Sequence, residues 1–334
     1  MRLEAIDPST WESELPAEGF EIFHLPEALQ VLDDHVDAEL RLYGAYKGQN
    51  AVGLFPAFVE EKPLVRMATS PPPGLSVPRL GPLVMPTSPK QRKRESVNRE
   101  FVELLVDELD ADSRRSLLRV VCPLEYGDPR PFDWSGFRVE NDFTYVLDLA
   151  GRSTDEVRSA FSSGLRRELR TLEEADVTVG VEGVDAALRV HEDVAARYAE
   201  RGEAHQLPAS VVRDLVEALG DRCRVYVARN GSGEYLGGIV ALYSNDVASF
   251  WLGGVARSYE GASVNTGLHW EIIADIVEGP PVDGVWGYDL VGANTPRLCR
   301  YKSKFGADLV GYHTVESDGL GMSVAKQAYT LVNK

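Results

Sequence analysis

The sequence predicts an α/β (α+β) protein made of two copies of one module, each a mixed, mostly antiparallel sheet flanked by helices. The same order of elements occurs twice, over roughly a hundred residues per copy. The tripeptide Ser-Val-Asn stands at 96–98 and again at 263–265. With 334 residues and 44% hydrophobic content, the chain is long enough for two ordinary domains. We place them at residues 1–148 and 149–334.

Each copy is expected to contain a hairpin and a further strand. Residues 41–60 and 224–243 both consist of an apolar strand, a polar turn with glycine and a second apolar strand. Another apolar segment follows in each copy and ends with residues 80–84 or 252–255. This pattern is typical of antiparallel pairing.

A helix and a closing strand are expected next in each copy. Residues 95–109 and 262–277 place apolar side chains at helical spacing. A buried strand follows each helix, and then an aromatic residue beside a glycine precedes a last strand. An antiparallel hairpin followed by a helix and another strand favours a mixed sheet covered by helices.

Two helices are predicted between the copies. Ser153 or Thr154 can cap the first, with Glu156 placed to complete a capping box. Its continuation carries a basic face of four arginines, namely Arg158, Arg166, Arg167 and Arg170. The second helix is expected over residues 184–201, where Leu188, His191, Val194 and Tyr198 share a face.

Charge and composition restrict the partners. The formal net charge is −17, from 35 basic and 52 acidic residues, which argues against a general binder of DNA or of anionic membranes. An acid-rich, lysine-poor surface suits a salt-rich cytoplasm, although an ordinary acidic enzyme has the same composition. Three widely spaced cysteines predict neither disulfides nor a metal site. No signal-peptide core or membrane-spanning run occurs, so we expect a cytoplasmic protein without membrane insertion.

Four segments carry a resemblance to a known family. They are "SSGLRRELRTLEEADVTV", "YLGGIVALY" with "ASFWLGGV", "VNTGLHWEII" and "YDLVGANTPRLCRYKSKFG". The chain resembles the GNAT acyltransferase fold present twice, as in the FemAB-like transferases and the acetyltransferase domain of cellulose and exopolysaccharide biosynthesis proteins. The resemblance covers nearly the whole chain and is strongest over residues 146–310.

The resemblance implies transfer of an acyl or aminoacyl group to an amine without a covalent enzyme intermediate. It implies no tightly bound cofactor. The donor would be an acyl-CoA or, alternatively, an aminoacyl-tRNA, which makes tRNA a second candidate partner. The acceptor would be an amine on a small molecule or a cell-envelope precursor. A non-catalytic scaffold with the same fold is the alternative of another class.

The last of the four segments contains the strongest site candidates. Its strand should end near Leu290, which places Asn294 on a turn at the carboxyl end, where open sheets form ligand crevices. A short basic helix should then begin at Pro296. Residues at helical spacing share one face of it, namely Arg297, Arg300, Tyr301 and Lys304. Lys302 should project elsewhere.

In the FemAB-like family, the segment matching Lys302, Phe305 and Gly306 borders the transfer site. The resemblance suggests that Lys302 polarises the donor carbonyl or steadies a phosphate or carboxylate. Alternatively, Lys302 complements the helix macrodipole, worth about 0.3–1 kcal/mol. Asp289, at the strand end, is placed to accept the amine proton, or to make a structural hydrogen bond.

The donor-binding turn departs from the family pattern. GNAT enzymes hold the pyrophosphate of coenzyme A on a turn of the form Q/R-x-x-G-x-G/A that opens a helix. In "ARSYEGASVN", Arg257, Gly261 and Ala262 remain, whereas Glu260 occupies the first glycine position. Arg166 and Arg167 are further candidates for a phosphate, or else a solvated helix face. The first copy has no such glycine, and its basic run at 90–94 either contacts phosphate or is solvated.

Overall fold

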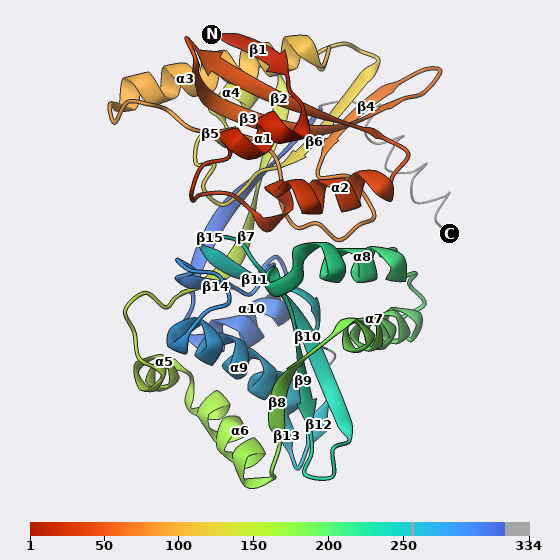
Figure 1. Cartoon of the computed structure of the whole chain (residues 1–334), viewed down its shortest axis with the longest axis vertical. Helices are drawn as coiled ribbons and strands as arrows, with labels where there is room; N and C mark the ends of the chain where they lie inside the picture. Colours follow the sequence, from red (N-terminus) through yellow and green to blue (C-terminus); the bar gives the residue numbers. More distant parts are fainter. Residues whose placement is uncertain (255–256, 318–334) are drawn as a thin grey trace. The chain divides into compact units, whose positions relative to one another are not determined.

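The structure of the chain is a computed structural model that describes residues 1–254 and 257–317 (Figure 1). Val255, at the end of an expected strand, lies outside the described residues. The chain forms two compact units. Of the described residues, the first contains Met1–Asp142 together with residues 311–317, and the second contains Phe143–Val310. The predicted domain limits, 1–148 and 149–334, stay a prediction.

The first unit is built on a mixed sheet whose strand order is β1-β2-β3-β4-β6-β15. Its strands are β1 (Arg2–Ala5), β2 (Glu39–Lys47), β3 (Asn50–Glu61), β4 (Arg66–Ser70), β5 (Leu83–Val84, paired with β3), β6 (Ser116–Val121) and the end of β15 (Asp308–Ser317). Among the described strand pairs of this unit, only β4–β6 is parallel. Its helices are α1 (Pro8–Glu14), η1 (Ile22–His24), α2 (Pro26–Asp34), α3 (Gln91–Glu108) and α4 (Arg130–Trp134).

The second unit has a matching sheet with the order β7-β14-β11-β10-β9-β8. Its strands are β7 (Phe137–Asp148), β8 (Thr178–Glu182), β9 (Cys223–Arg229), β10 (Tyr235–Tyr243), β11 (Val247–Gly253) and β14 (Gly287–Asp289), with a separate hairpin of β12 (Ser258–Tyr259) and β13 (Ala262–Ser263). The β11–β14 pair is the parallel one. Its helices are α5 (Thr154–Ala160), α6 (Ser163–Glu174), α7 (Val184–Ala199), α8 (Ala209–Leu219), η2 (Gly220–Arg222), α9 (Val264–Glu278), α10 (Pro296–Lys302) and η3 (Ser303–Phe305).

The predicted repeat is present. Hairpin β2–β3, strand β4, helix α3 and strand β6 correspond in order and pairing to β9–β10, β11, α9 and β14. The last strand of each copy is exchanged. β7 follows the first copy but pairs with β14, and β15 follows the second copy but pairs with β6. Each sheet therefore needs a strand from the other copy.

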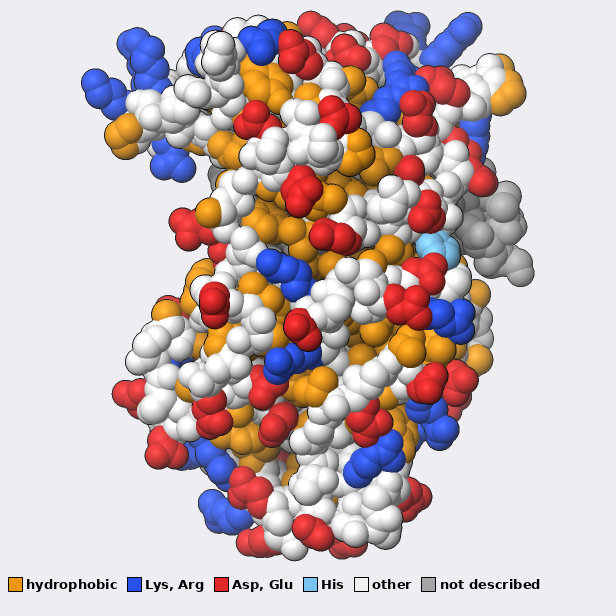
Figure 2. All heavy atoms as spheres, in the orientation of Figure 1, with side chains coloured by type: hydrophobic (Ala, Val, Ile, Leu, Met, Phe, Trp, Pro, Cys, Tyr) orange, Lys and Arg blue, Asp and Glu red, His pale blue; other side chains and the backbone are white. Residues whose placement is uncertain are grey.

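Helical periodicity placed the central helices correctly. In α3, Val97, Phe101 and Leu105 are buried against the first sheet, and in α9 Leu268 and Ile272 are buried against the second. The capping box of α5 is also confirmed: the Ser153 side chain accepts from the Glu156 amide, and the Glu156 carboxylate accepts from the Ser153 amide. Acidic side chains are spread over the face of the molecule shown in Figure 2.

Candidate active site

The candidate site begins where two parallel strands of the second unit separate. The ladder between β11 and β14 joins Val247–Ser249 to Gly287–Asp289 and goes no further among the described residues. β14 ends there, whereas β11 continues to Gly253. A β-bulge accompanies the separation, because the β10–β11 register shifts between Val240 and Ala241. Bulges bend a strand and redirect its side chains, often beside functional sites.

Lys302 is buried at the turn that follows β14. Its side chain is 4% exposed, and its ammonium group donates to the carbonyl oxygens of Leu290 (2.6 Å), Val291 and Gly292 (2.8 Å). An ammonium group has three hydrogens, so these carbonyls use all of its donors. Burial lowers the pKa of Lys302 to about 8, while Asp289 and Cys299 oppose the change.

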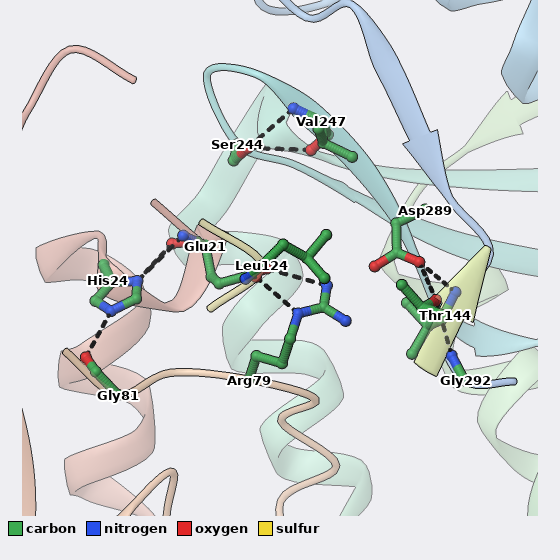
Figure 3. A network of polar contacts seen from close by, with 11 residues as sticks. Glu21, His24, Arg79, Gly81, Leu124, Thr144, Ser244, Val247, Asp289 and Gly292 are labelled. Carbon is green, nitrogen blue, oxygen red and sulfur yellow. Dashed lines mark hydrogen bonds and ion pairs between the residues drawn. The ribbon is translucent and has the colours of Figure 1, made fainter. Parts of the chain in front are cut away.

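Asp289 faces the same turn from the end of β14 and is fully buried. Its Oδ1 accepts from the hydroxyl of Thr144 (2.5 Å) and from the amide of Val291 (2.8 Å). The Thr144 oxygen accepts in turn from the amide of Gly292 (3.1 Å). Figure 3 shows Thr144 between Asp289 and Gly292. Asn294 adds a contact with β7, where its side-chain oxygen accepts from the Phe143 amide (2.8 Å).

The amides of the turn are occupied as well as its carbonyls. The four amides after Asp289 donate to Tyr145 O, Asp289 Oδ1, Thr144 Oγ1 and Phe143 O, in chain order from Leu290 to Ala293. An oxyanion is stabilised by preorganised donors aimed at it. Because these donors already have partners, the turn serves as a scaffold, and donors for an oxyanion must come from elsewhere in the site.

Helix α10 has the predicted start and composition. Thr295 caps it by accepting from the Leu298 amide (3.3 Å), and Pro296 occupies its first position. Arg297 and Lys304 are exposed, as predicted for a cationic face. Tyr301 differs, because its hydroxyl is buried. Burial and then the Glu168 carboxylate raise the pKa of Tyr301.

Phe305 and Gly306 have clear packing roles at the end of the same segment. Phe305 is buried with edge contacts to Phe161, Tyr301 and His269. Gly306 has φ +70°, and a Cβ there would lie 3.0 Å from the carbonyl oxygen of Ala160. Glycine meets both requirements, because it tolerates the left-handed region and has no side chain. Phe305 and Gly306 therefore allow the end of the α10 segment to pack closely against the end of α5.

The segment expected to bind pyrophosphate forms a tight hairpin. β12 pairs with β13 around Glu260 and Gly261, both with positive φ (49° and 84°). Arg257 donates to the Asp193 carboxylate (2.7 Å), which also accepts from the Tyr235 hydroxyl (2.9 Å). The guanidinium of Arg257 is thus already paired with an acid. The proposed donor-binding role of Arg257 and Gly261 stays a prediction.

Arg166 and Arg167 are exposed on α6, and no ion pair of theirs occurs among the described residues. Arg158, on α5, instead pairs with Glu173 (2.9 Å). A phosphate-binding role for Arg166 and Arg167 also stays a prediction.

A cluster of arginines was missed from the sequence. Burial lowers the pKa of Arg197, and the positive charges of Arg201 and Arg297 lower it further. No ion pair with a carboxylate is found for any of the three within residues 1–254 and 257–317. We call Arg197, Arg201 and Arg297 the arginine cluster. The available signal was the i, i+4 pair Arg197 and Arg201 at and just beyond the end of α7.

A buried histidine lies beneath the site. His269 is 2% exposed, and its Nδ1 lies 2.9 Å from the Tyr288 hydroxyl. Its ring contacts Phe250 and Phe305. Burial and then the charge of Lys302 lower the pKa of His269 to about 3. The imidazole is therefore neutral at physiological pH and belongs to the core.

Comparisons with known proteins agree with this geometry. Residues 159–303 match the family model described as an acetyltransferase (GNAT) domain. The search of curated proteins gave no match. Among solved structures, the chain is similar to FemX (11% identity, 100% of both chains covered, TM-score 0.69). It is also similar to L-PGS from Bacillus licheniformis (14% identity, 98% of this chain and 96% of that chain, TM-score 0.54).

A third similar structure is a tandem GNAT protein from the clavulanic acid biosynthesis pathway (14% identity, 95% of this chain and 99% of that chain, TM-score 0.50). At these identities the likeness shows the fold. Residues 159–303 are thus a GNAT-type domain, and the whole chain has a tandem GNAT fold shared with FemX. The predicted fold class and the resemblance to GNAT and FemAB-like acyltransferases are confirmed, and the general class of reaction that the family model supports is acyl transfer.

Two kinds of feature are not found in the described residues, namely a metal-binding group and a membrane-spanning helix. No group of three or more histidine, cysteine or acidic side chains able to hold a metal is found in the described ranges. Likewise, none of the described helices is both long enough and apolar enough to span a membrane.

Proposed function

We propose that this protein is an N-acyltransferase that moves an acyl group from an activated donor to an amine, without a covalent enzyme intermediate. The reaction would take place in the second unit, where β11 and β14 separate. The amine acceptor would belong to a small molecule or a cell-envelope precursor. We also propose a cytoplasmic location and, from the charge of −17 and the eight lysines among 35 basic residues, a salt-rich setting.

One observation favours the second unit over the first as the location of the transfer site. In the first unit, the corresponding parallel pair is joined from Arg66–Ser70 to Ser116–Val120, and the chain itself fills the position beyond it. The Leu80 amide donates to Val121 O (3.0 Å), and the Gly81 amide donates to Ser70 Oγ (3.0 Å). Gly81 packs directly on the β6 backbone, since a Cβ there would lie 3.1 Å from the Val121 carbonyl oxygen. A donor has no comparable opening in that unit.

An extended acyl thioester suits the opening in the second unit. Strand β11 continues past its last partner on β14, so a ligand with amide groups can lie along it as an added strand does. An acyl-CoA donor is therefore our first candidate. The neutral, buried core below, with Phe250 and His269 in contact, would exclude water from the reacting carbonyl.

Two observations favour an aminoacyl-tRNA as the second candidate. The segment that would hold the pyrophosphate of coenzyme A is a hairpin whose Arg257 is paired with Asp193. In addition, the arginine cluster and two exposed cations of the α10 segment, Arg300 and Lys304, have no carboxylate partner among the described residues. Cations near a reaction site attract the phosphate backbone of a nucleic acid, and the affinity of this attraction falls as the salt concentration rises.

In this proposal, Lys302 and Asp289 act by organising the turn that follows β14. A direct role of Lys302 in polarising the donor carbonyl stays a prediction, and its three carbonyl partners favour an indirect one. The arginine cluster is the better candidate for contact with an anionic group of a substrate, because guanidinium groups bind carboxylate and phosphate through two hydrogen bonds.

Ligand-induced stabilisation tests the proposal. The melting temperature is measured with an acyl-CoA, with an aminoacyl-tRNA and with neither, at 0.1 M and at 3 M potassium chloride. A donor at a hundred times its dissociation constant should add about 2.7 kcal/mol to the free energy of unfolding. Stabilisation by the thioester alone supports the first candidate, and stabilisation by the aminoacyl-tRNA alone supports the second.

A pair of variants locates the binding surface. Arg297→Gln should weaken stabilisation by aminoacyl-tRNA, whereas Arg213→Gln, an exposed arginine on α8, serves as the matched control. Absence of stabilisation by every donor would contradict the transferase and support the non-catalytic scaffold.

A further inference from the structure

The turn after β14 has a backbone that its sequence does not favour. Val291 has φ +47°, and Gly292 has φ +82°. A left-handed conformation is unfavourable for a β-branched residue and persists only where the surroundings hold it. The contacts that hold this turn therefore deserve a functional explanation, because strained backbone concentrates at binding and catalytic sites.

Thr144, on β7, makes two contacts that only a hydroxyl can combine. It donates to Asp289 Oδ1 (2.5 Å) and accepts from the Gly292 amide (3.1 Å). Since Asp289 Oδ1 also accepts from the Val291 amide (2.8 Å), the two side chains fix the amides of both left-handed residues. The Thr144 side chain is fully buried, so water does not replace it in this position.

Lys302 holds the opposite side of the same turn through its carbonyls. The turn leads directly into α10, which carries Arg297 of the arginine cluster. Thr144 is thus joined through Asp289 and Gly292 to the segment that determines where Arg297 lies. A shift of the turn would displace α10 relative to the opening between β11 and β14.

We propose that Thr144 is a positioning residue of the transfer site, which acts by locking Val291 and Gly292 through Asp289. We call this hydrogen-bonded arrangement of Thr144 and Asp289 with the Val291 and Gly292 amides the lock. The expected effect of Thr144 on the rate of transfer rests on the proposed function, whereas the lock itself does not. Thr144→Val keeps the shape of the side chain and removes both hydrogen bonds. Thr144→Ser keeps the hydroxyl.

The lock is tested by hydrogen exchange of the Val291 and Gly292 amides at pH 7. We expect exchange at least tenfold faster in Thr144→Val and restored within threefold by Thr144→Ser. Thr171→Val, which removes a hydroxyl bond to Arg167 O on α6 (3.1 Å), is the control and should leave both amides unchanged. Unchanged exchange in Thr144→Val, or acceleration spread over the whole second unit and not restored by serine, would overturn the lock.

The kinetic readout tests positioning separately, with the donor that stabilises the protein. Thr144→Val should lower kcat at least tenfold while the KM for the donor changes less than threefold, and Thr144→Ser should recover most of the rate. Full kcat in Thr144→Val with the lock lost would refute the positioning role. If the unaltered protein transfers no acyl group, the proposed function fails, and amide exchange still decides whether Thr144 is the lock.

Discussion

Three carbonyl oxygens determine what the Lys302 ammonium can do. The resemblance to FemAB-like proteins suggests a cation aimed at a reacting group, but all three hydrogens of the ammonium group are donated to carbonyls of the preceding turn. The pKa of about 8 adds a pH dependence. Above that pH, a neutral amine has one hydrogen fewer, so one carbonyl loses its donor. The turn should loosen there without a loss of global stability, since the neutral form is favoured by burial.

The buried His269 should make the protein sensitive to acid. Its pKa is about 3 in the folded chain and about 6.5 when unfolded. Its contribution to stability is therefore complete above pH 6.5 and is lost as the pH falls toward 3, because the unfolded chain binds the proton more tightly. Between pH 7 and pH 5 the free energy of unfolding should fall by roughly 2 kcal/mol from this residue. Denaturant titrations of the unaltered protein and of His269→Gln at pH 7 and at pH 5 measure this loss of unfolding free energy. An equal loss in the two proteins would contradict the assignment to His269.

At the scale of elements, sequence periodicity was most reliable where packing on one face decides the structure. Helices α3, α7 and α9 lie within two to four residues of their predicted limits, because an apolar stripe fixes a helix whatever it packs against. The β12–β13 hairpin was not predicted. Glu260 precedes Gly261 at its tip, whereas such turns favour Asn or Asp, so the local signal was absent.

The end of the α10 segment allows a sharp test of packing. Gly306→Ala must adopt φ near +70° and place Cβ against Ala160 O, whereas Gly151→Ala has φ +65° and open space. The control should lose about 1–2 kcal/mol of unfolding free energy from its backbone conformation, and Gly306→Ala should lose clearly more. Denaturant midpoints of the two variants provide the measurement. Equal losses would show that the contact with Ala160 is unimportant.

At the scale of the whole molecule, the two units have similar topologies but differ in whether a ligand can enter the space beyond the parallel pair of strands. Both contain a parallel pair of strands, β4–β6 in the first and β11–β14 in the second. In the first unit, Leu80 and Gly81 fill the space beyond the pair, and His24 lies 3.2 Å from the Gly81 carbonyl (Figure 3). A duplication therefore does not imply two sites.

We accordingly expect one donor per chain. Calorimetric titration with the donor that stabilises the protein should give a stoichiometry of one. Filling of the first unit by its own chain excludes a second molecule, since displacing it would break the hydrogen bonds from the Leu80 amide to Val121 O and from the Gly81 amide to Ser70 Oγ. Two equivalents bound at similar affinity would refute this explanation.

The sequence alone determined the duplication, the order of elements, the central helices and the segment that carries the candidate site. These depend on local periodicity and on motifs that are contiguous in the chain. Only the tertiary structure decided which polar groups meet. Thr144 and Gly292 are separated by 148 residues, and the charge of Arg297 acts on Arg197 of another helix. Such contacts depend on strand exchange and packing, which bring together residues whose spacing in the sequence contains no periodic signal.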